Sequence, residues 1–140
     1  MLASEIMTKN PECCVPTDPV MKAAQLMKTE DVGPIPVVEN NDERKLTGIV
    51  TDRDLAIKVV AEARDPKTTS VEQVMSEGLV TCRENDDVQS VLELMEDNQL
   101  RRIPVVDKKD YLVGIIAQAD IATRLGGTQA AGEVVQKVSQ

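Results

Sequence analysis

The sequence predicts an α/β protein made of two similar copies, each a small three-stranded sheet with two helices. The main observation is an internal repeat, in which residues of the first half recur 68 positions later and, after a two-residue gap, 66 positions later. This period is too long for a solenoid unit and too short for an ordinary domain, so we expect the copies to form one module. The repeated residues are Met7, Cys14, Asp18, Val20, Leu26, Met27, Ile35, Pro36, Val37, Val38, Leu46, Gly48, Ile49, Asp54 and Ala56.

The order of apolar segments is the second observation, because it is the same in both copies. Each copy begins with a short helix, at 4–7 and 70–75, for which Ser4 and Ser70 are the predicted N-caps, and continues into a leading strand near 13–15 or 79–82. In the amphipathic helix that follows, Asp18 is the predicted N-cap and Pro19 the first residue. Its apolar stripe predicts core residues at i, i+3, i+4 and i+7. These are Val20, Ala23, Ala24 and Met27, and then Val88, Val91, Leu92 and Met95.

Two buried strands and a closing helix complete each copy. Continuous apolar runs separated by a polar loop predict a hairpin at 35–38 and 46–50, repeated at 103–106 and 112–116. Closing helices are predicted at 52–63 and 118–125. The first copy therefore spans residues 1–66 and the second 67–125, and the tail 126–140 is predicted to add one short helix.

Composition argues against several classes of function. The chain has 140 residues, a net charge of −8 and 1% aromatic residues, so we expect neither a nucleic-acid partner nor an anionic membrane surface. It contains no His, which removes a histidine base and a Cys/His zinc pattern. We therefore expect no bound metal. Because no signal sequence or long apolar span is visible, we expect a cytoplasmic protein.

Three short motifs occur once in each copy and resemble those of the cystathionine-β-synthase (CBS) domain family. They are Ile6-Met7-Thr8 with Val74-Met75-Ser76, the Ile-Pro-Val-Val runs, and residues 48–54 with 114–120. The resemblance covers residues 2–125 and indicates the tandem arrangement called a CBS pair or Bateman module. It implies two copies packed about a pseudo-two-fold axis, with clefts between them that bind AMP, ADP, ATP or S-adenosylmethionine. No further cofactor is implied.

The resemblance puts one ligand site just after the 46–50 strand. In the pattern Gly-x-x-Thr-x-x-Asp, Asp54 would accept hydrogen bonds from both ribose hydroxyls, and Thr51 with nearby backbone N–H groups would bind phosphate. The residues expected to contact the adenine are Ile49, Ile35 and Ile116. The residues alone leave an alternative open, in which Thr51 or Asp52 only caps the helix and Asp54 only stabilises its first turn.

The second copy departs from this pattern, because Ala117 stands where the first copy has Thr51. Asp120 is retained, so we expect two unequal sites, the first being nearer to the family pattern. Arg101 and Arg102 precede the second Ile-Pro-Val-Val run, where basic residues of the family often reach ligand phosphates. Arg102 is the stronger candidate, and ordinary surface salt bridges are the alternative.

Four other residues near these motifs receive structural interpretations. Arg53 and Lys58, on the predicted closing helix, are interpreted as solvated charges. Cys14 and Cys82 occupy equivalent positions in the leading strands and are interpreted as buried free thiols. A redox-sensing role for these thiols is the alternative.

We therefore expect a non-catalytic sensor that binds an adenosyl ligand, forms a homodimer through its helices and regulates an unidentified protein. Three other functions are considered: an interaction module with empty clefts, a nucleotide hydrolase and a thiol redox sensor. A hydrolase is disfavoured because Asp52, Asp54 and Asp120 show neither a paired arrangement nor metal-ligand spacing.

Overall fold

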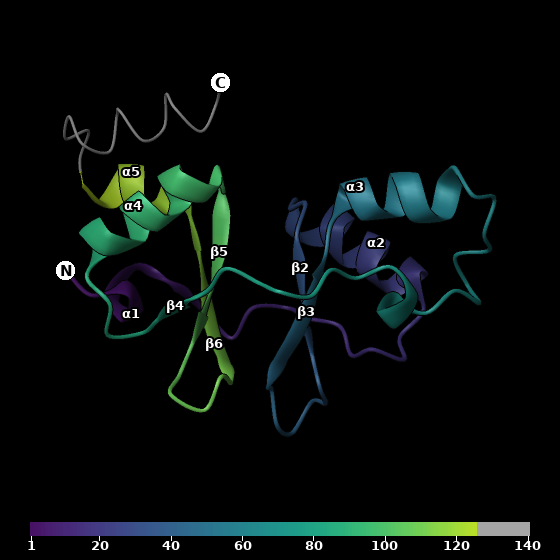
Figure 1. The fold of residues 1–140 in the computed structure, drawn as a ribbon, viewed down its shortest axis with the longest axis horizontal. Coiled ribbons are helices and arrows are strands. Elements are labelled where there is room, and N and C mark those ends of the chain that lie inside the picture. Colours follow the sequence, from purple (N-terminus) through teal and green to yellow (C-terminus); the bar gives the residue numbers. More distant parts are fainter. Residues whose placement is uncertain (126–140) are drawn as a thin grey trace. The chain divides into compact units, whose positions relative to one another are not determined.

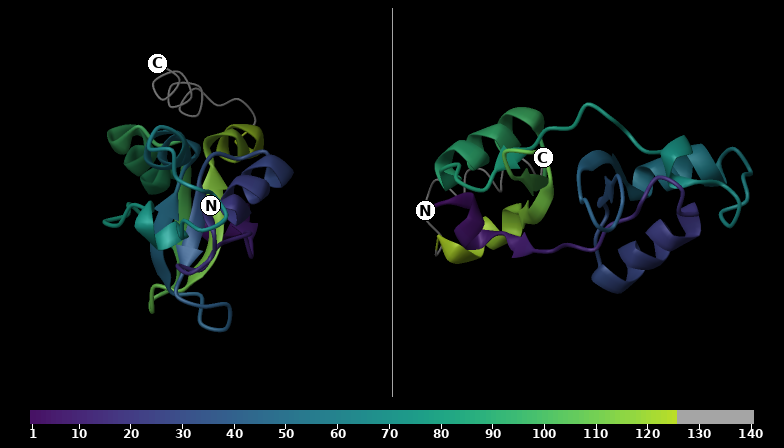
Figure 2. Two further views of the ribbon diagram at one scale, coloured as in Figure 1. Left: turned by 90° about the vertical axis from the view of Figure 1, so that its right-hand side faces the viewer. Right: turned by 90° about the horizontal axis from the view of Figure 1, so that it is seen from below.

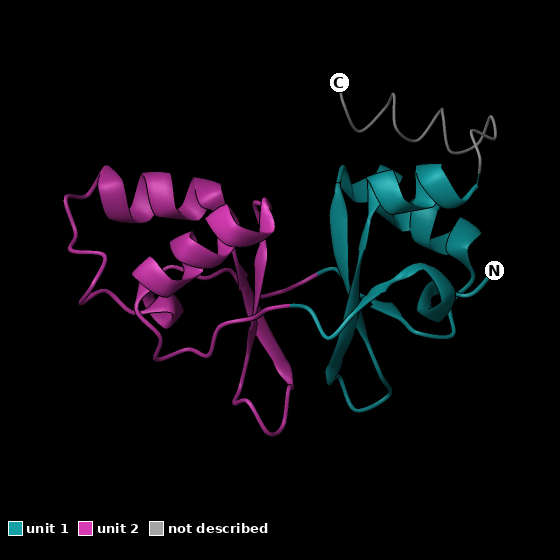
Figure 3. Cartoon of the chain, turned by 180° about the vertical axis from the view of Figure 1, so that it is seen from behind, with its two compact units in different colours: residues 1–11, 80–140 teal, residues 12–79 magenta. Residues whose placement is uncertain are grey.

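The computed structural model describes residues 1–125, which fall into two compact units (Figure 1 and Figure 3). Unit 2 is the continuous segment Glu12–Leu79, whereas unit 1 combines Met1–Pro11 with the chain from Val80 onward. Each unit contains a small sheet and helices, which confirms the predicted α/β class. The helix predicted in the tail 126–140 lies outside the described residues.

Unit 2 is organised around one antiparallel hairpin, in which Ile35 of β2 lies opposite Val50 of β3. Isolated bridges extend the hairpin at both edges, from Cys14 to Val37 and from Ser76 to Ile49. The closing helix changes from α-helical to π-helical along its length. The elements of unit 2 are α2 (Val20–Glu30), β2 (Ile35–Val38), β3 (Leu46–Val50), α3 (Asp52–Leu55), the π-helix η1 (Ala56–Val60) and the 3-10 helix η2 (Val71–Gln73).

Unit 1 repeats this plan with a four-stranded sheet in the order β1-β6-β5-β4. Helices α4 and α5 lie beside this sheet (Figure 1 and Figure 2), and their buried residues form one core with those of the strands. The leading strand β4 runs parallel to β5, and the other two pairs are antiparallel. The elements of unit 1 are α1 (Ala3–Ile6), β1 (Thr8–Lys9), β4 (Cys82–Arg83), α4 (Val88–Asn98), β5 (Arg102–Val106), β6 (Leu112–Ala117) and α5 (Gln118–Arg124).

The two sequence copies exchange their opening segments. Strand β1, from the beginning of the first copy, pairs with β6 of the second copy, so that Thr8 lies opposite Ile115. In unit 2, Ser76 of the second copy bridges Ile49 of the first. The sheet of unit 1 therefore has an edge strand, β1, that the predicted three-stranded sheet lacks. The prediction lacks this strand because the sequence pattern does not show which copy an opening segment packs against.

Two glycines make room for the exchanged segments. A Cβ added at Gly114 would lie 2.5 Å from Met7 Sδ, and one added at Gly48 would lie 2.6 Å from Met75 Sδ. Both distances are far shorter than van der Waals contact, so only glycine admits the methionine side chain against the strand. This contact explains why the sequence repeats the methionine and the glycine together.

The helix caps differ from two predictions. The first residue outside α1 is Leu2 rather than Ser4, and the N-cap of α2 is Pro19 rather than Asp18. The Asp18 carboxylate instead accepts a hydrogen bond from the Val15 N–H at 2.9 Å and pairs with Lys22 at 3.1 Å. A local turn in the preceding loop therefore outcompetes the helix for this carboxylate. The predicted cap at Ser70 has the expected position before η2.

The apolar stripes of the two central helices are buried to different extents. All four predicted core residues of α4 are buried. In α2, Val20 and Ala23 are buried, whereas Ala24 and Met27 are partly exposed. The side chain of Met27 packs at the margin of the unit 2 core. The stripe is thus correctly predicted, but its outer edge in the first copy faces solvent.

Candidate functional site

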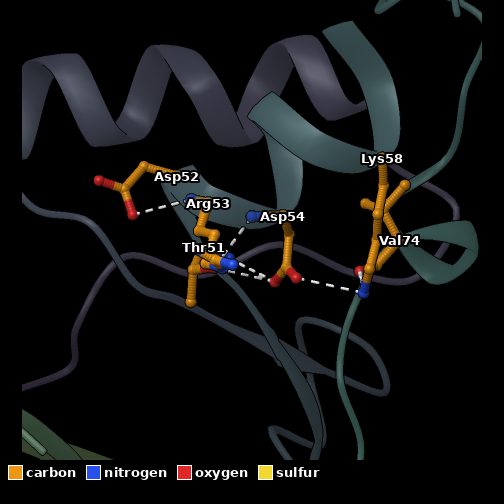
Figure 4. Close-up of polar contacts among 6 residues, drawn as sticks. All are labelled: Thr51, Asp52, Arg53, Asp54, Lys58 and Val74. Carbon is orange, nitrogen blue, oxygen red and sulfur yellow. Dashed lines mark hydrogen bonds and ion pairs between the residues drawn. The ribbon is translucent and has the colours of Figure 1, made fainter. Parts of the chain in front are cut away.

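The motif of the first copy lies where β3 ends and α3 begins (Figure 4). Thr51 is the N-cap of α3, and its Oγ1 accepts a hydrogen bond from the Asp54 N–H at 3.1 Å. The Thr51 N–H and hydroxyl both donate to Asp54 Oδ2, at 2.9 and 3.0 Å. These reciprocal bonds form a capping box. Thr51 and Asp54 therefore have the capping role that the sequence left open beside ligand binding.

Lys58 completes the surroundings of Asp54. Its Nζ lies 3.2 Å from Asp54 Oδ1 and donates a hydrogen bond to the Val74 carbonyl at 3.0 Å (Figure 4). The side chain of Asp54 is 13% exposed and that of Lys58 is 43% exposed. The interpretation of Lys58 as a solvated charge is therefore incomplete, because its half-exposed ammonium also contacts Asp54 and Val74. Its spacing of i, i+4 from Asp54 is the sequence signal that would have identified the pair.

The Asp54 carboxylate has little remaining capacity to accept hydrogen bonds. A carboxylate offers about four lone-pair positions. The Thr51 N–H, the Thr51 hydroxyl and the Lys58 ammonium occupy three of them. A ribose cis-diol carries two hydroxyls, so a ligand that donates both of them to Asp54 has to displace one of these donors.

The second copy has the same aspartate but a weaker cap. Ala117 is the N-cap of α5, and its N–H donates to Asp120 Oδ2 at 3.3 Å. Among residues 1–125, this is the one hydrogen bond to the Asp120 carboxylate, and no cation forms an ion pair with it. The Asp120 carboxylate can therefore accept further donors without displacing any.

A groove of about 510 Å³ adjoins the start of α5 and contains both predicted arginines. The Gln118 N–H donates to the Arg101 carbonyl at 2.8 Å, which holds the residues before β5 against the beginning of α5. Within the part of the chain that the structure describes, neither Arg101 nor Arg102 forms an ion pair. Their guanidinium groups are therefore available to an anion. The groove is lined by Arg101, Arg102, Ala117, Gln118, Ala119, Ala122 and Thr123.

The equivalent positions of the first copy carry no arginine, because Gly33 and Pro34 stand there. The Asp52 N–H donates to the Gly33 carbonyl at 3.1 Å, as Gln118 does to Arg101 in the second copy. The Asp52 carboxylate lies beside Gly33, with Oδ1 3.2 Å from the position of an added Cβ. A negative charge thus lies in the first copy where the second has two positive charges.

The isoleucines predicted to contact the adenine lie on different faces of the strands. Ile35 and Ile116 are 2% and 0% exposed and belong to the two cores. Ile49 is only partly buried, and so is Ile115, which is its repeat counterpart. The alternation of strand residues and the repeat spacing both place Ile115, rather than Ile116, on the same side of its strand as Ile49 is on β3.

Burial governs the chemistry of the two equivalent cysteines. It raises the pKa of the Cys14 thiol to about 11, with a smaller contribution from the Asp18 carboxylate. Burial likewise raises the pKa of Cys82 to about 12, with Asp86 acting in the same direction. Both thiols therefore stay protonated at neutral pH, in the form that is a poor nucleophile.

The described residues lack two features that would indicate other kinds of function. No group of three or more His, Cys, Asp or Glu side chains in residues 1–125 is arranged to hold a metal ion. None of the helices in the same residues has both the length and the apolar content needed to cross a membrane.

Comparison with known proteins gives the family. The CBS domain model matches residues 3–61 and 71–127. The CBS domain-containing protein YhcV of Bacillus subtilis is 38% identical over 135 residues, which cover 96% of this chain and 93% of that protein. This module of two exchanged α/β copies is therefore a tandem CBS-domain protein, and the chain belongs to the CBS domain family.

The solved structures that share this fold include two that are at least 28% identical to this chain. Hypoxic Response Protein I (HRPI), with two coordinated zinc ions, aligns with a TM-score of 0.77 and 35% identity over 88% of this chain and 98% of that one. The CBS domain pair of protein MJ0100 aligns with a TM-score of 0.73 and 28% identity over 91% of this chain and 97% of that one. That domain pair is in complex with 5′-methylthioadenosine and S-adenosyl-L-methionine.

Proposed function

We propose that this protein is a non-catalytic regulatory module that binds an adenosine-containing ligand such as AMP, ADP, ATP or S-adenosylmethionine. The observation that carries the proposal is the repeated aspartate. Asp54 and Asp120 both follow a buried strand, and in each copy a backbone N–H of the N-cap residue holds the carboxylate. The adenosyl ligands of the related MJ0100 domain pair support the ligand class.

Each predicted residue has a role in this proposal. Asp54 and Asp120 accept hydrogen bonds from ribose hydroxyls, because a carboxylate can serve both hydroxyls of a cis-diol. Thr51 contributes a hydroxyl to the first site. The partly exposed Ile49 and Ile115 provide apolar surface for the adenine. The buried Ile35 and Ile116 hold the strands in place from the cores.

The second copy is the better site for a ligand that carries phosphate. Arg101 and Arg102 are free of ion pairs among the described residues and line a groove at the start of α5. Guanidinium groups bind phosphate oxygens through paired, charge-assisted hydrogen bonds. In the first copy, the Asp52 carboxylate would repel the same phosphate.

We further propose that ligand occupancy is passed on through a homodimer to a regulated protein in the cytoplasm. Ile57 and Val60, on the closing helix of the first copy, are 46% and 76% exposed. Exposed apolar side chains on a helix favour association with a second copy. A ligand acts on such an assembly only if it binds one arrangement more tightly than another.

A ligand-free interaction module is the second candidate function. The engaged carboxylate of Asp54 and the missing hydroxyl at Ala117 favour it. It differs from the first candidate in one measurable way, because it predicts no saturable binding of any adenosyl compound.

Isothermal titration of nucleotide-stripped protein with AMP, ADP, ATP and S-adenosylmethionine separates these functions. Carried-over purine is easily detected by absorbance, because the chain has one Tyr and no Trp. The proposal predicts saturable binding that is weakened in Asp54→Ala and in Asp120→Ala, and unchanged in the control Asp97→Ala on the exposed face of α4. No heat with any of the four compounds, from folded and empty protein, would contradict the proposal and favour the interaction module.

A further inference from the structure

Lys58 joins the candidate ribose site to a second segment of unit 2. Its ammonium contacts Asp54 Oδ1 and the Val74 carbonyl at the same time, at 3.2 and 3.0 Å (Figure 4). Val74 belongs to the opening segment of the second copy, residues 70–76, which packs against the first copy within unit 2. The chain continues from this segment to β4. One half-exposed side chain therefore touches both the carboxylate and the segment that connects the copies.

The opening segment is also held by β3, directly before Thr51. The Ile49 N–H donates to the Ser76 carbonyl at 3.0 Å, and the Ser76 N–H donates to the Ile49 carbonyl at 2.9 Å. The side chain of Met75 packs against Gly48. The segment is thus held by a strand pairing at one place and by the Lys58 side chain at another.

In unit 1 the closing helix also contacts an opening segment, that of the first copy, but this contact does not involve the motif aspartate Asp120. Arg124 is the repeat counterpart of Lys58, and its Nη2 donates to the Glu5 carbonyl of α1 at 3.0 Å. Among the residues that the structure describes, Arg124 forms no ion pair with Asp120. Holding the opening segment is therefore common to both copies, and only Lys58 connects that hold to the candidate site.

We propose that Lys58 is a positioning residue that couples ribose binding at Asp54 to the opening segment 70–76. This inference rests on the proposed function. A ligand that donates two hydroxyls to Asp54 exceeds its remaining acceptor capacity, so one donor has to leave. The Thr51 donors belong to the helix cap, whereas the Lys58 ammonium is half-exposed and can be hydrated. Lys58 is the donor that leaves, and its hold on Val74 weakens.

Titration with adenosine and 2′-deoxyadenosine tests the coupling, because these probes differ by one ribose hydroxyl and carry no phosphate. Every protein in this titration carries Asp120→Ala, so that Asp54 is the only one of the two motif aspartates left to bind a ribose. In Lys58→Met, adenosine is expected to gain about two- to threefold in affinity relative to 2′-deoxyadenosine, the size of a half-exposed i, i+4 ion pair. Lys58→Arg and the matched control Arg124→Met are expected to keep the original ratio. An unchanged ratio in Lys58→Met overturns the coupling.

Amide hydrogen exchange tests the hold on the segment without any ligand. Lys58→Met is expected to speed exchange at Val74, Met75 and Ser76, whereas Arg124→Met is expected to speed it at Met7. Saturating adenosine should speed exchange at the first three amides in the unaltered protein. Unchanged exchange in Lys58→Met overturns the hold. If the unaltered protein binds AMP but not adenosine, the coupling falls and the proposed function stands. If it binds neither adenosine nor any of the four compounds titrated above, both fall. In either case exchange in Lys58→Met still decides whether Lys58 holds the segment.

Discussion

The two copies differ most at the start of their closing helices. The first copy has the complete Thr-x-x-Asp motif, yet its aspartate accepts from Thr51 and from Lys58. The second copy has Ala117 in place of the threonine, yet the Asp120 carboxylate accepts only one hydrogen bond among the described residues. The motif that is more complete in sequence is thus the one whose carboxylate is less available. A motif of hydrogen-bonding residues can stabilise its own helix as well as a ligand.

The two copies also differ in the charges near the start of their closing helices. The groove of the second copy contains two arginines without an ion-pair partner in residues 1–125. At the equivalent place in the first copy, the Asp52 carboxylate lies beside Gly33. Ligands that differ in charge at the 5′ position should therefore distinguish the copies, even though their backbones are built alike.

The largest effect is expected at a feature that the copies share. Gly114→Ala places a Cβ against Met7, and Gly48→Ala places one against Met75. We expect each to lower the free energy of unfolding by about 1 to 3 kcal/mol, as for overpacking in a core. Chemical denaturation measures this, and Met7→Ala combined with Gly114→Ala should cost less than the two single changes added together. Additive costs would show that the contact does not explain the glycine.

The buried thiols should make both copies sensitive to alkaline pH. In the unfolded chain a thiol titrates near pH 9.0, whereas in the fold Cys14 and Cys82 titrate near 11 and 12. Their contribution to stability is therefore complete below pH 9 and is lost as the pH rises through this window. We expect a fall of about 2 kcal/mol for each thiol between pH 8 and 11. The fall should shrink in Cys14→Ala combined with Cys82→Ala and persist in Cys13→Ala. An equal fall in all three proteins would assign it to other groups.

Removing the aspartates should destabilise the two copies unequally. Asp54→Ala removes the acceptor of two Thr51 hydrogen bonds and the partner of Lys58, so a loss of about 1 to 2 kcal/mol in unfolding free energy is expected. Asp120→Ala removes one long hydrogen bond and should cost less than half of that. Denaturation of both variants beside Asp97→Ala measures the difference. Equal losses would contradict the unequal engagement of the carboxylates.

Restoring the missing hydroxyl should make the second copy resemble the first. Ala117→Thr supplies an N-cap oxygen to the first turn of α5, and we expect it to raise the free energy of unfolding by about 0.5 to 1 kcal/mol. Thr51→Ala is the reciprocal change and should lower it by a similar amount. A threonine at 117 that leaves stability unchanged would indicate that the N-terminus of α5 is already satisfied.

Much of the fold follows from the sequence, because strands and helices repeat at matching positions. The apolar runs and the repeat predict the hairpins that begin at 35–38 and 103–106, the closing helices and the positions of Asp54 and Asp120. The exchange of opening segments is not predicted, because an apolar residue such as Met7 gives the same sequence pattern whichever sheet it packs on. The prediction that Asp18 caps α2 is wrong for a related reason, since a turn and a helix compete for the same carboxylate.

The candidate site is only partly predictable, because availability depends on three-dimensional neighbours. Thr51 and Asp54 are correctly placed together. Lys58 is predicted only as a solvated charge, although its i, i+4 spacing from Asp54 is typical of an ion pair and the structure shows that it is the third donor to this carboxylate. The sequence predicts that Ile116 contacts the adenine, but Ile116 is buried, whereas its neighbour Ile115 has exposed surface. The arginines are recognisable from their charge in an acidic chain, and the structure adds that they line a groove.

Titration with AMP of the unaltered protein, Asp54→Ala, Asp120→Ala and the double variant Arg101→Ala/Arg102→Ala tests the central claim most directly. The account predicts saturable AMP binding that falls most in Asp120→Ala and in the double arginine variant, and less in Asp54→Ala. AMP binding that is lost in Asp54→Ala and retained in the other variants would contradict it.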